Sequence, residues 1–226
     1  MGNLNRLSCL VLVPAYNAAD HLPELIARIR KYVCDDNLLV IDDGSTDDTV
    51  TVLKTQGVNY ISYPQNRGKG SALMTGFRYA VDGGFRSVLT LDADLQHLPE
   101  EIPRFYALDN GHRLLLGVRR ISLDDMPLGR WLSNSMTSLI VSVFSNQPIR
   151  DSQSGFRLIP IDMLRLLKLK THRYDFESEM LLKAASLGFT VVPVPISTVY
   201  AGSRSYINPP ADTVRFVRQV LRSLWY

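Results

Sequence analysis

Residues 89–97 read LTLDADLQH, an apolar run that ends in two carboxylates one residue apart, Asp92 and Asp94. The run SVLTL at 87–91 has the length and composition of a buried strand. Two carboxylates at the end of such a strand lower stability unless they bind something, because like charges repel and burial disfavours both. The stretch therefore predicts a binding site at the end of a strand.

The first 120 residues repeat this pattern of an apolar run followed by a polar cluster or a helical pattern. Further strand-like runs lie at 9–13, 38–41, 58–63 and 112–118. Short β-type runs that alternate with helices predict an α/β fold, a mainly parallel sheet covered on both faces. Ligands bind such sheets at the carboxyl ends of the strands. The polar clusters fall at those ends, at 14–17, 42–47 and 92–96.

The remainder of the chain is less regular. The segment 131–149 has no charged residue but is rich in Ser and Asn, so it predicts a helix that is buried or lies on an interface, rather than a membrane span. A helix is predicted at 176–188, followed by a strand whose prolines, Pro193 and Pro195, place it at a sheet edge. Residues 212–226 predict an amphipathic helix with arginines on one side.

Composition and charge narrow the function. The 226 residues suit one domain, and 46% apolar and 21% charged residues are typical of a globular protein. A net charge of +3 is too small to indicate nucleic-acid binding. Residues 150–226 hold 11 Lys and Arg against 6 Asp and Glu, which predicts an anionic partner there. The two cysteines lack metal or redox spacing and favour a cytoplasmic protein.

Two glycine-containing turns have two interpretations each. In VIDDGSTDDT (40–49), Asp42 and Asp43 either form the turn into a helix or accept N–H groups of a ligand, such as the imide of a base. In NRGKGSALMTGF (66–77), the backbone either binds a phosphate or simply starts a helix beside a surface lysine. The spacing of the second turn is not that of a Walker motif.

Asp92 and Asp94 have the chemistry of a cation site. Carboxylates one residue apart can converge on one hard cation, and Mg²⁺ and Mn²⁺ often share such ligands with substrate phosphates. The alternative is a helix cap beside a solvated acid, because Pro99 and two glutamates start the next helix. Acidic clusters at more than one strand end along the same sheet edge favour the cation site.

Five segments together resemble the family 2 glycosyltransferases, and within them the dolichyl- or polyprenyl-phosphate mannosyl- and glucosyltransferase branch. The segments are PAYNAADHL (14–22), VIDDGSTDDT (40–49), NRGKGSALMTG (66–76), LTLDADLQH (89–97) and DSQSGFR (151–157). Their order and spacing match that family over residues 8–205. The resemblance implies a GT-A fold, a nucleotide-sugar donor, a divalent cation, Mg²⁺ or Mn²⁺, and inversion at the sugar carbon.

The resemblance also assigns a donor site. The matching positions are Pro14, Tyr16, Ile41, Asp43, Asp92, Ala93, Asp94, Gln96 and Arg204. Pro14 and Tyr16 would frame the base and ribose, Ile41 and Asp43 would contact the base, and Arg204 would face the donor phosphates. Asp92, Asp94 and Gln96 would hold the metal. The family often has Glu after Asn17, where this chain has Ala18, and Arg204 stands where a lysine is expected.

The second half of the chain would hold the acceptor. Arg119 and Arg130 match basic residues near the acceptor phosphate, and Asn134 is a further acceptor-binding candidate. Asp151 opens a loop that in the family closes on sugar and acceptor. The glutamates of FESE (176–179) match the family's FE-x-E pattern. The chain would thus be one domain, 1–226, with a nucleotide-binding half at about 1–120 and an acceptor half at about 121–226.

The function expected is an inverting, metal-dependent transfer of a hexose from a GDP- or UDP-sugar to a polyprenyl-phosphate-type lipid. Asp94 and Asp151 are the catalytic candidates. A phosphate acceptor is already anionic and needs no base, whereas a hydroxyl acceptor needs a carboxylate such as Asp151. A family 2 enzyme with a hydroxyl acceptor is the alternative. A nucleotidyltransferase and a non-catalytic nucleotide-sugar-binding module are more remote.

Two segments bear on membranes. The uncharged 131–149 segment either shelters a lipid chain or is buried in the core or a dimer contact, so a homo-oligomer is one of the outcomes. The arginines and the Leu-Trp-Tyr end of 212–226 either seat it on an anionic membrane surface or dock on the domain. The expected location is cytoplasmic, with peripheral contact at the inner face of the membrane as one possibility.

Overall fold

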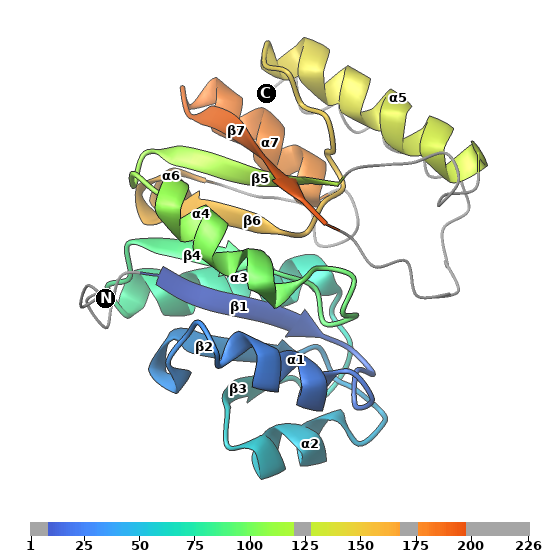
Figure 1. The fold of residues 1–226 in the computed structure, drawn as a ribbon, viewed down its shortest axis with the longest axis vertical. Coiled ribbons are helices and arrows are strands. Elements are labelled where there is room, and N and C mark those ends of the chain that lie inside the picture. The colour runs from blue at the N-terminus through green and yellow to red at the C-terminus, as the bar shows by residue number, and fades with distance from the viewer. Residues whose placement is uncertain (1–8, 120–127, 168–175, 198–226) are drawn as a thin grey trace.

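The computed structural model describes residues 9–119, 128–167 and 176–197, which are built around one sheet (Figure 1). The strands are β1 (Cys9–Ala15), β2 (Leu38–Asp42), β3 (Asn59–Ser62), β4 (Ser87–Thr90), β5 (Arg113–Arg119), β6 (Arg157–Pro160) and β7 (Thr190–Ile196). Their spatial order is β3-β2-β1-β4-β6-β5-β7. The pairings are parallel except for those that β6 forms with β4 and β5.

Helices cover both faces of the sheet. They are α1 (Leu22–Ile29), α2 (Thr49–Gln56), α3 (Lys69–Asp82), α4 (Ile102–Leu108), α5 (Leu128–Ser145), α6 (Ile161–Leu166) and α7 (Phe176–Ser186), with short 3₁₀ turns at Asp35–Asn37 and Pro99–Glu101. Alternate residues of β1 divide between two apolar cores. Leu10 and Leu12 share one core with α3, α6 and α7, and Val11 and Val13 share the other with α1, α2 and α4.

The predicted α/β architecture is confirmed, with one strand added. The expected strands occur within two residues of their predicted ends, and β7 lies at the sheet edge as its two prolines indicate. β6 was not predicted, because RLIP is short and begins with an arginine, which is typical of a loop. Arg157 is nevertheless fully buried.

The antiparallel strand β6 determines what reaches the active edge of the sheet. Its first residue, Arg157, pairs with Thr90 at the end of β4 and with Leu116 near the end of β5. The loop that enters β6 therefore lies at the same edge as the carboxyl ends of β1, β2, β4 and β5. An additional parallel strand would have brought the loop after it to this edge, rather than DSQSGF (151–156).

Figure 1 shows α5 at the end of the molecule next to β5 and β7, opposite the end formed by β3 and α2. Within the three described ranges, no helix combines the length and apolar character needed to cross a membrane. The helix predicted at 212–226 lies outside those ranges.

Candidate active site

The turn after β2 is held in place by the carboxylates that were expected to face a ligand. Asp42 accepts the backbone N–H of Ser45 at 3.1 Å, and Asp43 accepts those of Arg67 and Gly68, both at 2.8 Å. Both carboxylates are buried. Asp43 therefore ties the turn after β2 to the glycine-rich turn that starts α3, and its contact with a base stays a prediction.

The loop after β1 packs on the same turn. Asn17 accepts the backbone N–H of Thr46 at 2.8 Å through its side-chain oxygen. Tyr16 is 49% exposed, so its ring is accessible to a ligand. Pro14 and Ile41 are buried and lie in register inside the sheet. The donor contacts predicted for these three residues are compatible with this edge and stay predictions.

Asp92 lies at the centre of a charged network. Its Oδ1 is 2.7 Å from Nζ of Lys69, and the same ammonium is 3.0 Å from Oε1 of Glu177. The loop before β6 also touches this carboxylate, because a Cβ added to Gly155 would come 2.5 Å from Oδ2 of Asp92. The imidazole of His97 lies on the other side, 3.9 Å from the same oxygen.

The surroundings of Asp92 and Asp94 shift the pKa values of the two acids in opposite directions. Burial alone would raise the pKa of Asp92, but the charge and hydrogen bond of Lys69, together with the charges of His97 and Arg119, lower the pKa to about 2. Desolvation and the neighbouring charge of Asp92 raise the pKa of Asp94. Burial lowers the pKa of His97 against the attraction of the two acids. The surroundings of Asp94 thus disfavour its negative charge.

These residues fit a divalent cation that arrives with a diphosphate. Within the described residues, no cluster of three or more His, Cys, Asp or Glu forms a closed metal cage. Mg²⁺ is usually held by one or two carboxylates together with substrate phosphates, so Asp92 and Asp94 suffice. The mutual repulsion that raises the pKa of Asp94 is what a cation would relieve. Gln96 donates its backbone N–H to Asp94 at 3.1 Å, and its metal contact stays a prediction.

On the acceptor side, Arg119 and Asp151 bind each other. Nε and Nη2 of Arg119 donate to Oδ2 and Oδ1 of Asp151 at 2.6 and 2.8 Å. Asp151 is fully buried. A bidentate pair of this kind fixes the orientation of the guanidinium. This geometry favours a positioning role for Asp151, and its role as a general base stays a prediction.

Asn134 joins this pair. Its Nδ2 lies 3.5 Å from Oδ1 of Asp151, and its buried Oδ1 has no hydrogen-bond partner among the residues that the structure describes. An unpaired buried amide oxygen is rare and marks a position where a donor group is missing. The acceptor contact predicted for Asn134 is compatible with that. The side chain of Arg130 and all of Arg204 lie outside the described parts of the chain.

The inner side of helix α5 is mostly polar, apart from the buried Val141, and its outer side is mostly apolar. The buried positions include Asn134, Thr137, Ser138 and Ser145, and the large exposed side chains are Met136, Leu139, Val143 and Phe144. The exposed set recurs with helical spacing and forms one face. On the inner side, Ser138 accepts the backbone N–H of Ser152 at 3.0 Å. The polar side of α5 thus supports the loop before β6, and its apolar side faces solvent.

The buried side chain of Arg157 also holds the loop before β6 in place. Its guanidinium donates to the carbonyl oxygens of Ser152, Ser154 and Glu177, at 2.9, 2.7 and 2.7 Å. Burial lowers its pKa against the attraction of nearby acids. No sequence pattern indicates that this charged side chain lies in the core, so its role was not predicted, and neither was that of Lys69.

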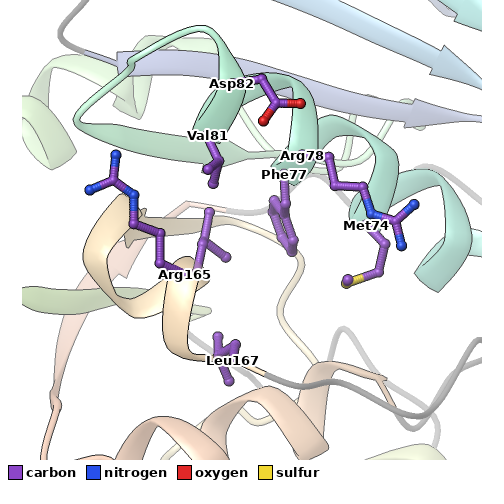
Figure 2. A pocket seen from close by; sticks show the side chains of 8 residues that line it. Met74, Phe77, Arg78, Val81, Asp82, Arg165 and Leu167 are labelled. Atoms are coloured by element: carbon purple, nitrogen blue, oxygen red, sulfur yellow. The ribbon is translucent and has the colours of Figure 1, made fainter.

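Figure 2 shows a cavity of about 180 Å³ elsewhere in the molecule, between α3 and α6. Its lining residues are Met74, Phe77, Arg78, Val81, Asp82, Leu164, Arg165 and Leu167. None of them belongs to the charged network at the strand ends, and its three charged side chains are exposed. The cavity is therefore separate from the candidate active site.

Comparison with known proteins agrees with this geometry. Residues 10–170 match the model of the family described as glycosyl transferase family 2, and the chain belongs to this family. It is 29% identical to the undecaprenyl-phosphate mannosyltransferase of Micrococcus luteus, over 84% of this chain and 83% of that one. It is 28% identical to the UDP-N-acetylglucosamine–dolichyl-phosphate N-acetylglucosaminyltransferase of Methanococcus voltae, over 84% and 85%.

A solved structure shares the fold. Glucosyl-3-phosphoglycerate synthase from Mycobacterium tuberculosis, in complex with Mn²⁺, UDP and glucosyl-3-phosphoglycerate, has a TM-score of 0.74 at 21% identity, covering 95% of this chain and 79% of that one. The predicted GT-A fold and family are confirmed, and the protein is a glycosyltransferase. Because the chain is a glycosyltransferase of this family, the two remote alternatives, a nucleotidyltransferase and a non-catalytic nucleotide-sugar-binding module, do not apply.

Proposed function

We propose that the protein transfers a hexose from a UDP- or GDP-sugar to a polyprenyl-phosphate-type lipid, with inversion at the sugar carbon and with a divalent cation. The observation that carries the choice of acceptor is the outward apolar face of α5, which begins next to Asn134 and the Arg119–Asp151 pair. A lipid phosphate needs both parts, a cationic group for its head and an apolar surface for its chain.

The donor side of the proposal is supported by the strand-end geometry. Tyr16 is accessible for stacking on a base, and Asp92 and Asp94 would hold the cation. When bound, the cation supplies positive charge to the leaving diphosphate. Relatives named for polyprenyl- and dolichyl-phosphate acceptors, and a structural neighbour complexed with Mn²⁺ and UDP, support the same scheme.

The acceptor side requires no general base in this scheme. A phosphate monoester is already anionic near neutral pH, so the chain has only to place it. Arg119, oriented by Asp151, would hold one phosphate oxygen. Arg130, whose backbone lies in the first turn of α5, is the second candidate for this task.

The lipid chain would lie along Leu139, Val143 and the other exposed apolar residues of α5. Leu139 and Val143 are 64% and 67% exposed, which is unfavourable in water over a whole helix face. Covering them with a polyprenyl chain or the bilayer that contains it removes that surface from water. The inward polar face of the same helix is then explained, because it is the side that must hold the 151–156 loop.

The test is a donor screen with and without the lipid. The protein is incubated with UDP- and GDP-sugars and Mn²⁺ or Mg²⁺, in the presence of polyprenyl phosphate or the matching unphosphorylated polyprenol. Release of nucleoside diphosphate and labelled lipid are measured. The proposal expects turnover that requires both the metal and the lipid phosphate. Equal transfer to the polyprenol, or to a water-soluble hydroxyl acceptor, would contradict the proposed acceptor.

A further inference from the structure

Lys69 is the one residue of the glycine-rich turn that reaches the cation site. It is the first residue of α3, directly after Gly68, whose backbone N–H is held by Asp43 at 2.8 Å. The side chain is 30% exposed, and its ammonium lies between the carboxylates of Asp92 and Glu177, at 2.7 and 3.0 Å. The turn therefore delivers a positive charge to the site from a fixed anchor.

The ammonium of Lys69 contacts a carboxylate oxygen that a bound cation would need as a ligand. It is bound to Oδ1 of Asp92, one of the two carboxylates that fit the metal. Glu177, at the start of α7, holds it from the other side and is itself fixed, because its carbonyl oxygen accepts a hydrogen bond from Arg157. Lys69 is thus held in place from two elements and is not a surface lysine that happens to approach Asp92.

We propose that Lys69 is a positioning residue that serves as the resident counter-ion of Asp92 and makes metal binding depend on the donor. A free divalent cation has to compete with the ammonium for the carboxylate and is repelled by its charge. A cation that arrives with a nucleoside diphosphate brings negative charge with it, and the ammonium then attracts the complex. The proposal rests on the proposed function in one respect, namely that Asp92 and Asp94 hold the cation.

The consequence is a preferred order of binding. The site binds free metal weakly, and metal and nucleotide bind together. In the same arrangement Glu177 favours metal binding, because it competes with Asp92 for the ammonium of Lys69 and adds negative charge to the site. Substitutions at these two positions are therefore expected to change the affinity for free metal in opposite directions.

The experiment measures the binding of free Mn²⁺ by electron paramagnetic resonance and the binding of UDP and GDP with Mn²⁺ by calorimetry. Lys69→Met removes the charge and keeps the length, and it is expected to bind free Mn²⁺ about tenfold more tightly and the nucleotide–Mn²⁺ complex about tenfold more weakly. Glu177→Gln is expected to bind free Mn²⁺ more weakly than the wild type. Lys69→Arg keeps the charge and should stay within about twofold of the wild type.

Lys54→Met, on the exposed side of α2, is the matched control and should change neither affinity. Thermal unfolding shows which variants are folded, and Glu177→Gln remains informative if Lys69→Met is not. Unchanged or weaker binding of free Mn²⁺ by a folded Lys69→Met, or tighter binding by Glu177→Gln, overturns the counter-ion role. If Asp94→Asn also leaves nucleotide-dependent Mn²⁺ binding intact, the metal assignment in the proposed function fails as well.

Discussion

The two sides of the active edge are built in different ways. On the donor side, the carboxylates of Asp42 and Asp43 accept backbone N–H groups and fix the turns between parallel strands. On the acceptor side, side chains from distant elements pair with one another, as Arg119 does with Asp151. In the proposed scheme, the donor side is therefore fixed mainly through the backbone, and the acceptor side depends on a few side-chain contacts.

Removing a proposed metal ligand from the donor side should have the largest effect. Asp94→Ala is expected to reduce metal-dependent turnover about 10³-fold, because the leaving diphosphate loses the charge that stabilises it. The melting temperature should stay the same or rise, because desolvation and the charge of Asp92 raise the pKa of Asp94 and so disfavour its charged form in the folded protein. Steady-state kinetics with saturating donor and a thermal melt check both parts. Asp36→Ala, in the exposed 3₁₀ turn before β2, is the control, and full activity of Asp94→Ala would refute the metal assignment.

A substitution on the acceptor side should leave the donor site intact. Asp151→Asn removes the charge that orients Arg119 and is expected to raise the KM for the lipid phosphate about 10- to 100-fold, the range for losing a charged hydrogen bond. The KM for the donor should not change. Asp162→Asn, exposed on α6, is the control.

The same variant separates the two roles considered for Asp151. If the residue is a general base, kcat falls instead, and the dependence of kcat on pH loses its acidic limb. A pH–rate profile of the wild type and of Asp151→Asn, each at saturating acceptor, distinguishes a positioning residue from a base.

The contact between Gly155 and Asp92 joins the two sides, so a larger residue at position 155 should affect both. A Cβ at Gly155 would lie 2.5 and 2.7 Å from the two carboxylate oxygens of Asp92, so Gly155→Ala forces the loop or the acid to move. The expected result is a loss of about 1–3 kcal/mol of stability, as for other overpacked sites, and about a tenfold rise in both KM values. Gly57→Ala is the control: its φ of +62° strains any side chain, but apart from its chain neighbours no heavy atom of the described residues would lie within 4 Å of an added Cβ. Wild-type kinetics for Gly155→Ala would show that the contact is not needed.

The donor side could be predicted from sequence because its signals are local. Each parallel strand is a short apolar run, and the polar cluster that follows it must lie at the same sheet edge as the next. The two acids of LTLDADLQH were assigned in this way. Lys69 was not, because its partners, Asp92 and Glu177, are 23 and 108 residues away and no spacing rule connects them.

The acceptor side was harder for two physical reasons. A charged residue at the start of a strand is typical of a surface position, so neither β6 nor the burial of Arg157 was expected. The uncharged 131–149 segment predicted a helix, which is confirmed, but Ser and Asn on one side and Leu and Val on the other do not reveal which side faces the sheet. The burial of Asn134 and the contacts of Ser138 with the 151–156 loop show that the polar side is inside.

The smallest expected effect tests that orientation of α5. Leu139→Gln and Val143→Gln change exposed side chains, so the free energy of unfolding should stay within about 0.5 kcal/mol of the wild type. If this face shelters the lipid chain, the KM for a long polyprenyl phosphate rises about threefold per substitution, while a short, water-soluble prenyl phosphate is used as before. Leu166→Gln, an equally exposed leucine on α6, should change neither. If these variants lose stability and the effect on KM does not depend on the length of the prenyl chain, a protein surface covers this face instead. The unfolding measurement contains no lipid acceptor, but it does contain further copies of the chain.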